Sequence, residues 1–179
     1  MYYGSVQDPE TQKILDEVMC VYMKGPRSYT AEDLVEIQCH GSIVSLRNIL
    51  RACFQMGAAP AEPGEFTKRA FMNGRIDLAQ AEAVIDLIQS RSDQSFEAAL
   101  DQAAGSLSQR VNRLRDELKE LLILLTVNMD YPDEDIEELT YGQIENSLQQ
   151  IDDTCANLLE FSKEGRMIRE GFSVTIMGK

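Results

Sequence analysis

Two long stretches in the second half of the chain repeat apolar residues in alternating steps of four and three. The first runs from about Ser106 to Met129 and the second from about Tyr141 to Glu164. Such spacing gives a helix one apolar seam and suits packing against another helix. We therefore expect two long helices of a helical bundle, the first broken by Pro132. The seams consist of Leu107, Val111, Leu114, Leu118, Leu121 and Leu125, and of Ile144, Leu148, Ile151, Cys155 and Leu158.

The composition changes near residue 77, because glycine and proline are frequent before it and sparse after it. An apolar stripe predicts a helix over Leu78–Gln89, with Asp77 as its cap. Ser92 or Asp93 is expected to cap a shorter helix that reaches Ala104. Residues 77–171 are thus predicted to form an all-α helical bundle domain, with Gly165 or Gly171 ending its last helix.

Residues 1–76 combine strand and helix patterns. Ile14–Met23 and Leu34–Cys39 read as strands, and Ala58–Ala61 as a short third strand. Ser42 is expected to cap a helix that Gly57 ends. The fold class predicted for the chain is α+β, a small mixed α/β domain followed by the bundle.

A second helix of the first domain is expected after Pro63-Gly64-Glu65, ending near Gly74. At the other end of the chain, Phe172–Met177 reads as a strand, and a lone strand buries little. We therefore expect residues 172–179 to begin a further domain that the chain does not contain. A phosphate loop of the form GxxxxGK[ST] would begin at Gly178 and is incomplete here.

Charge and composition exclude several classes of protein. The 179 residues include 17 Lys and Arg against 30 Asp and Glu, a net charge of −13, which disfavours a surface that binds nucleic acid all over. The longest apolar run, Leu121–Leu125, is far short of a membrane span, and residues 1–4 do not resemble a signal peptide. The cysteines form no CxxC pair, which indicates reduced thiols in a cytoplasmic protein and no metal site: Cys20, Cys39, Cys53 and Cys155.

Few residues stand out as candidates for chemistry. His40-Gly41-Ser42 leads from a strand into a helix, which allows either an anion site or an ordinary helix cap. The acidic run 130–138 could hold a divalent cation or be a solvated loop, and it lacks the register of a calcium loop. Glu36 is a carboxylate on a mostly apolar strand, and Arg75 is a cation at a helix end, so either could contact a ligand.

Four segments resemble one family. Ser28–Gly41 is similar to its YTGEDxxExxxHGG segment, and Pro63–Ala83 is similar to its PGEFTxRAFLNGKxDLxQAEA block. Met129–Asp135 resembles its acidic DFPDEE turn, and Arg169–Lys179 resembles the entry to its G domain. The family is that of the tRNA modification GTPases called MnmE or TrmE, and the resemblance covers essentially the whole chain.

The resemblance implies an N-terminal domain that binds a tetrahydrofolate derivative, 5-formyl or 5,10-methylene, and mediates homodimerisation. It also implies a G domain that uses GTP, potassium and magnesium and is inserted into the helical domain. With an FAD-containing partner, MnmG (also called GidA), such a protein modifies C5 of the wobble uridine of tRNA. The resemblance then implies a GTP hydrolase in the intact protein only. This chain would be a truncated form that lacks the family's first strand region, the G domain and the C-terminal helix.

Two residues match the family's folate contacts, namely Glu36 and Arg75. No catalytic residue matches within this chain. Ala31, Cys39 and Ser42 stand where the family usually has glycine. Two other interpretations remain open from the residues: a folate-dependent aminomethyltransferase-like domain that needs no GTPase, and a non-enzymatic helical dimerisation scaffold.

Overall fold

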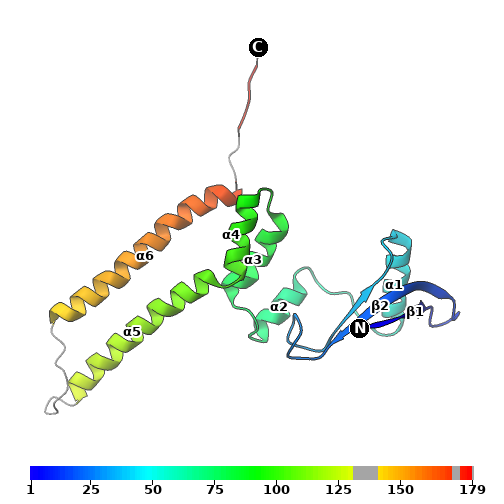
Figure 1. The fold of residues 1–179 in the computed structure, drawn as a ribbon, viewed down its shortest axis with the longest axis horizontal. Helices are drawn as coiled ribbons and strands as arrows, with labels where there is room; N and C mark the ends of the chain where they lie inside the picture. The colour runs from blue at the N-terminus through cyan, green and yellow to red at the C-terminus, as the bar shows by residue number, and fades with distance from the viewer. Residues whose placement is uncertain (131–140, 171–173, 179) are drawn as a thin grey trace. The chain divides into compact units, whose positions relative to one another are not determined.

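The computed structural model describes residues 1–130, 141–170 and 174–178 and divides the chain into two compact units, Met1–Asp77 and Leu78–Lys179 (Figure 1). The first unit contains a sheet and two helices, and the described part of the second contains helices alone. The predicted α+β class is confirmed, with a small mixed unit ahead of a helical one.

The first unit is built on an antiparallel sheet with the strand order β1-β2-β3. The strands are β1 (Tyr2–Gln7), β2 (Ile14–Met23) and β3 (Leu34–Gln38). β2 has the predicted bounds, and β3 ends one residue earlier than expected. β1 was not anticipated, because its residues show no clear alternation; it forms by pairing along β2, with a break in register between Val6 and Gln7.

Helix α1 (Ile43–Gln55) packs on β2, the strand that contributes the buried Val18. Ser42 caps it as predicted, since its side chain accepts a hydrogen bond from the Val44 N–H at 3.3 Å. Gly57 follows the helix with φ +98°, the left-handed conformation expected of a residue that ends a helix. Helix α2 (Glu65–Met72) is the second predicted helix of this unit.

The short strand predicted over residues 58–61 is wrong, because this segment has no regular secondary structure. The Ala58 N–H donates to the Cys53 carbonyl at 3.1 Å, which completes the end of α1. Pro60 has no N–H to donate to a neighbouring strand. Two of the four backbone donors of this segment are therefore already used or missing.

The second unit begins with α3 (Leu78–Gln89) and α4 (Asp93–Ala103), close to their predicted bounds. Ser92 caps α4, and its backbone N–H and side chain exchange hydrogen bonds with Ser95. Two glutamine side chains join the helices, since Gln80 donates to the Ala103 carbonyl at 3.0 Å and Gln102 to the Ala79 carbonyl at 3.1 Å.

Two long helices follow, α5 (Ser106–Asp130) and α6 (Tyr141–Glu170), and Figure 1 shows them running alongside each other. α5 is close to its predicted extent. α6 continues past Glu164, so of the two glycines predicted to end it Gly165 is wrong, and the helix ends at Glu170, the residue before Gly171. A glycine inside a helix costs about 1 kcal/mol, which is too little to end a helix of this length.

The predicted seams of α5 and α6 are buried only in part. Leu114 and Leu121, seven residues apart in α5, are 9% and 8% exposed, and Ile151 of α6 is 9% exposed, whereas Leu107, in the same row of α5, is 38% exposed. The alternate row, with Val111, Leu118 and Leu148, is 51%, 44% and 46% exposed, and Cys155 is exposed as well. In a coiled coil the partner helix covers both rows, so these exposures mean that the described helices cover the seam only in part.

The strand predicted over residues 172–177 is not observed where the structure describes this segment, because residues 174–178 have no regular secondary structure. An extended segment becomes a strand only by pairing with another, and no partner strand is recorded for these residues. Most of the acidic run 130–138 lies outside the described residues.

Candidate functional site

Arg75 follows the end of α2 in a well-defined backbone conformation. Gly74 has φ +70°, and its N–H donates to the Phe71 carbonyl at 3.0 Å. The Arg75 N–H donates to the Ala70 carbonyl, also at 3.0 Å. These two bonds form the Schellman arrangement that closes a helix, and they need a residue such as glycine that tolerates the left-handed region. The backbone of Arg75 is therefore anchored to α2.

The Arg75 side chain lies over an aromatic ring from another segment. Its guanidinium carbon is 5.1 Å from the centroid of the Tyr29 ring, within the range of a cation–π contact. The Tyr29 hydroxyl is 3.0 Å from the hydroxyl oxygen of Thr67, which lies in α2. Tyr29 thus contacts both the helix and the residue that follows it.

Two further interactions join the segment around Tyr29 to α2. The Asn73 side-chain amide donates to the carbonyl of Thr30 at 2.7 Å, and Thr30 is 2% exposed. Arg69 pairs with Glu32 at 3.2 Å and with Glu65 at 2.7 Å, and the hydrogen bond from Arg69 lowers the pKa of Glu65. We call these contacts the clasp, formed by Tyr29, Thr30 and Glu32 on one side and Thr67, Arg69, Asn73 and Arg75 on the other.

The clasp is tied to the sheet through Asp33, which directly precedes β3. Its carboxylate accepts hydrogen bonds from the Gly25 N–H at 2.9 Å and from the Tyr22 hydroxyl at 2.8 Å. The Gly25 amide and then the Tyr22 hydroxyl lower the pKa of Asp33. The loop between β2 and β3 is thereby closed at its base.

Glu36 lies in the middle of β3, opposite Val21 of β2, and its side chain is exposed. Alternation along the strand places it on the same face of the sheet as Leu34 and Gln38. No ion pair joins it to Arg75. Among the described residues, neither Glu36 nor Arg75 takes part in an ion pair.

The two predicted residues therefore belong to one unit. Arg75 is part of the clasp, and one side of the clasp lies in the loop that leads, through Asp33, into the strand that carries Glu36. A carboxylate can accept two hydrogen bonds from neighbouring N–H groups of a ligand. A guanidinium can donate to a carbonyl or carboxylate oxygen. The arrangement offers an acceptor and a cationic donor, but no acid–base pair or nucleophile for a reaction.

The turn before α1 is stabilised by an aspartate of the same chain. Asp16 accepts hydrogen bonds from the His40 N–H at 3.0 Å, from His40 Nδ1 at 2.7 Å and from the Ser45 hydroxyl. The bond from Ser45 first, and those from His40 next, lower the pKa of Asp16 to about 2. Of the two alternatives for this turn, an anion site or a helix cap, the structure shows the helix cap at Ser42. The Asp16 carboxylate of the same chain lies near the start of α1.

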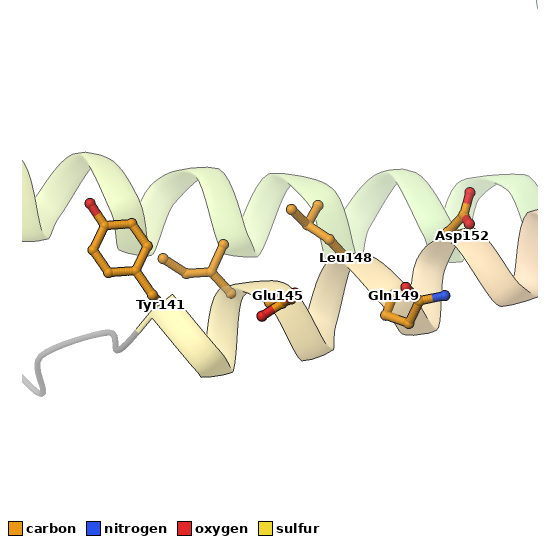
Figure 2. Close-up of a pocket in the computed structure, with 6 residues that line it drawn as sticks. Tyr141, Glu145, Leu148, Gln149 and Asp152 are labelled. Atoms are coloured by element: carbon orange, nitrogen blue, oxygen red, sulfur yellow. The ribbon is translucent and has the colours of Figure 1, made fainter.

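A pocket of about 430 Å³ lies along α6 in the second unit, and Figure 2 shows Tyr141, Leu148 and Asp152 among the residues that line it. All of its lining residues come from this single helix, so it is a shallow surface hollow. The described residues contain no cluster of three or more His, Cys, Asp or Glu side chains suited to a metal ion. None of the helices in the described ranges combines the length and hydrophobicity needed to cross a bilayer.

Sequence reasoning missed the residues that support Arg75. Tyr29, Thr67 and Asn73 lie in segments that resemble the family, yet none shows a periodic or charged pattern that singles it out. Their role depends on contacts across 38 and 43 residues of sequence. Asp16 was missed for the same reason, since its partners are 24 and 29 residues away.

The chain thus combines a small α+β unit, with an exposed carboxylate on its antiparallel sheet and an arginine at a helix end, and a following helical unit. Residues 1–75 match the family described as "GTP-binding protein TrmE N-terminus", and residues 78–173 match the "MnmE helical domain". The chain therefore belongs to the MnmE (TrmE) family.

Similar proteins include three that are each named tRNA modification GTPase MnmE. Those of Alkaliphilus oremlandii and Acetivibrio thermocellus are 46% and 48% identical over 177 residues, or 99% of this chain. That of Bacillus licheniformis is 46% identical over 178 residues, also 99% of the chain. The matched region is 38% of the first relative and 39% of the other two, so the chain spans well under half of their length.

Proposed function

We propose that the first unit binds a tetrahydrofolate derivative, 5-formyl or 5,10-methylene, through Glu36 and Arg75. The observation that supports the proposal is the clasp, which joins Arg75 to the loop before β3, the strand that carries Glu36. Neither side chain forms an ion pair with any residue that the structure describes. The Glu36 carboxylate accepts the 2-amino and ring N–H groups of the pterin, which present two parallel donors. The Arg75 guanidinium donates to a carbonyl or carboxylate oxygen of the same ligand.

We further propose that the whole protein is a tRNA modification GTPase, as its relatives are named. GTP, potassium and magnesium act in a G domain, and no GTPase residue is assigned to this chain. The protein works as a homodimer with an FAD-containing partner, MnmG, on C5 of the wobble uridine of tRNA. These statements rest on family membership, and the folate site is the part that residues of this chain can test.

The folate site is tested by titrating the full-length protein with 5-formyl-tetrahydrofolate, followed by calorimetry. Glu36→Gln keeps the size of the side chain but replaces one acceptor oxygen with a donor, and should weaken binding by at least tenfold. Arg75→Gln removes the cation and should weaken binding by a similar factor. A charged hydrogen bond is worth about 1.5–3 kcal/mol, which corresponds to roughly tenfold to more than a hundredfold in affinity.

The matched controls are Glu62→Gln and Lys68→Gln, which change the same charges at exposed positions of the same unit. Both should bind like the unsubstituted protein. If Glu36→Gln and Arg75→Gln bind as tightly as these controls, the assignment of the site is wrong. If the unsubstituted protein does not bind the ligand at all, the proposed folate function fails.

A further inference from the structure

We propose that Tyr29 is a positioning residue for Arg75, and that Thr67 fixes Tyr29 in turn. The inference rests on the folate site proposed above and concerns how that site is prepared for its ligand. The backbone of Glu36 is held in a paired strand. Arg75 lies beyond the end of a helix, where only its backbone is anchored.

The first argument is the mobility of an arginine side chain. Several rotatable bonds separate the guanidinium from the backbone, so a free Arg75 would occupy many orientations. The Tyr29 ring lies 5.1 Å from the guanidinium carbon and restricts these orientations from one side. Restricting a side chain before the ligand arrives reduces the entropy lost on binding.

The second argument is that Tyr29 itself is held at both ends. Its hydroxyl meets the Thr67 hydroxyl at 3.0 Å, and its ring is partly buried. The next residue, Thr30, is 2% exposed and accepts the hydrogen bond from Asn73 at 2.7 Å. The ring is therefore attached to α2 at its hydroxyl and to the loop before β3 at its backbone.

The third argument is the geometry that remains available to a ligand. A guanidinium that rests against an aromatic ring still has N–H donors that can reach an oxygen, and a planar pair of them matches a carboxylate or a carbonyl. Arg75 makes no ion pair with any residue in the described ranges, so these donors are available. Lysine could not replace it, since an ammonium lacks the planar donors.

The test is a double-mutant cycle on affinity for 5-formyl-tetrahydrofolate in the full-length protein. Tyr29→Leu removes the ring and should weaken binding by about two- to fivefold, the size expected of an exposed cation–π contact. In the Arg75→Gln background the same change should have no further effect, because Tyr29 acts through Arg75. A purely structural role would not produce this dependence on the arginine.

Two milder variants keep the test decisive if Tyr29→Leu does not fold. Tyr29→Phe retains the ring and loses the bond to Thr67, and Thr67→Val loses the same bond from the other side. Each should weaken binding by less than Tyr29→Leu, and the two should not add. Tyr2→Leu, at a tyrosine of β1 that is 72% exposed, is the control and should bind normally.

The inference is overturned if Arg75→Gln weakens binding while all the Tyr29 and Thr67 variants bind normally. It is also overturned if Tyr29→Leu weakens binding equally with and without Arg75. In both cases the folate site itself stands. Absence of binding by the unsubstituted protein would instead remove the proposed function, and this inference with it.

Discussion

The two units of the chain differ in charge and in how their parts are held together. Residues 1–77 contain eight Lys and Arg against ten Asp and Glu, whereas residues 78–179 contain nine against twenty. The first unit joins distant segments through polar side chains, as in the clasp and around Asp16. The second relies on a buried row of apolar residues in long helices. Polar contacts between distant segments can fix the position of a single charged side chain, whereas a regular apolar seam holds long helices together.

The charge difference also bears on contact with tRNA. The net charge is −2 in the first unit and −11 in the second. A body with that density of negative charge repels phosphate over most of its surface. If the whole protein handles tRNA, the helical unit is therefore unsuited to supply most of the positive contacts.

The largest effect is expected in the helical seam. Leu121→Ala removes a side chain that is 8% exposed and should lower the free energy of unfolding by about 2–4 kcal/mol. Leu118→Ala, at a position that is 44% exposed, should cost less than half as much. Urea denaturation followed by circular dichroism measures both. Equal losses would mean that the two rows of the seam are not differently buried.

A smaller effect is expected in the clasp. Asn73→Ala removes the hydrogen bond to the Thr30 carbonyl and leaves a buried acceptor without a partner. The stability of the first unit should fall by about 1–2 kcal/mol. Lys68→Ala, at an exposed position of the neighbouring helix α2, is the control and should change little. A thermal unfolding temperature that is the same for Asn73→Ala as for the control would show that the clasp is not stabilising.

A stabilising change is expected at Ala31, which has φ +60°. Alanine is strained in this region and glycine is not, although glycine loses more entropy on folding. Ala31→Gly should therefore raise stability by roughly 0.5 kcal/mol. Ala58→Gly, at a position without positive φ, should not stabilise. A lower unfolding temperature for Ala31→Gly than for the unsubstituted protein would contradict the left-handed conformation.

The smallest change in stability is expected from the hydrogen bonds that Asp16 accepts from His40 and Ser45, when the pH is lowered. It is small because the His40 side chain is 74% exposed to solvent. The pKa of Asp16 is lowered from 3.8 to about 2 by the bonds from Ser45 and His40. The unfolded chain is thus protonated first as the pH falls. The contribution of Asp16 is fully present above about pH 4 and is lost as the pH falls toward about 2.

Asp16→Asn should flatten this part of the stability profile, and Glu62→Gln should leave it unchanged. Unfolding temperatures measured between pH 2 and pH 6 make the comparison. A profile for Asp16→Asn that falls as steeply as that of the unsubstituted protein would show that the network does not hold a charged carboxylate.

Most of the fold could be predicted from local patterns in the sequence. The strand over Ile14–Met23, the cap at Ser42 and the helix over Leu78–Gln89 all depend on residues close together along the chain. β1 was missed because pairing with β2, rather than any alternation of its own, makes it a strand. Of the two glycines predicted to end α6, Gly165 lies inside the helix, which ends at the residue before Gly171.

The candidate site was predictable only in part. Glu36 and Arg75 could be identified because they lie in segments that resemble a family. The residues that hold Arg75 could not, since Tyr29 contacts it across 46 positions of sequence and no local pattern records that contact. Likewise, no local pattern predicted that Asp16 of β2 would accept hydrogen bonds from His40 and Ser45 at the turn before α1.

The most direct test of the account is amide hydrogen exchange in the full-length protein with and without saturating 5-formyl-tetrahydrofolate. The account predicts slower exchange in β3 and in residues 70–76 when the ligand is present, with α5 and α6 little changed. Protection confined to the helical unit, or no change at either segment, would contradict the claim that the first unit holds the folate.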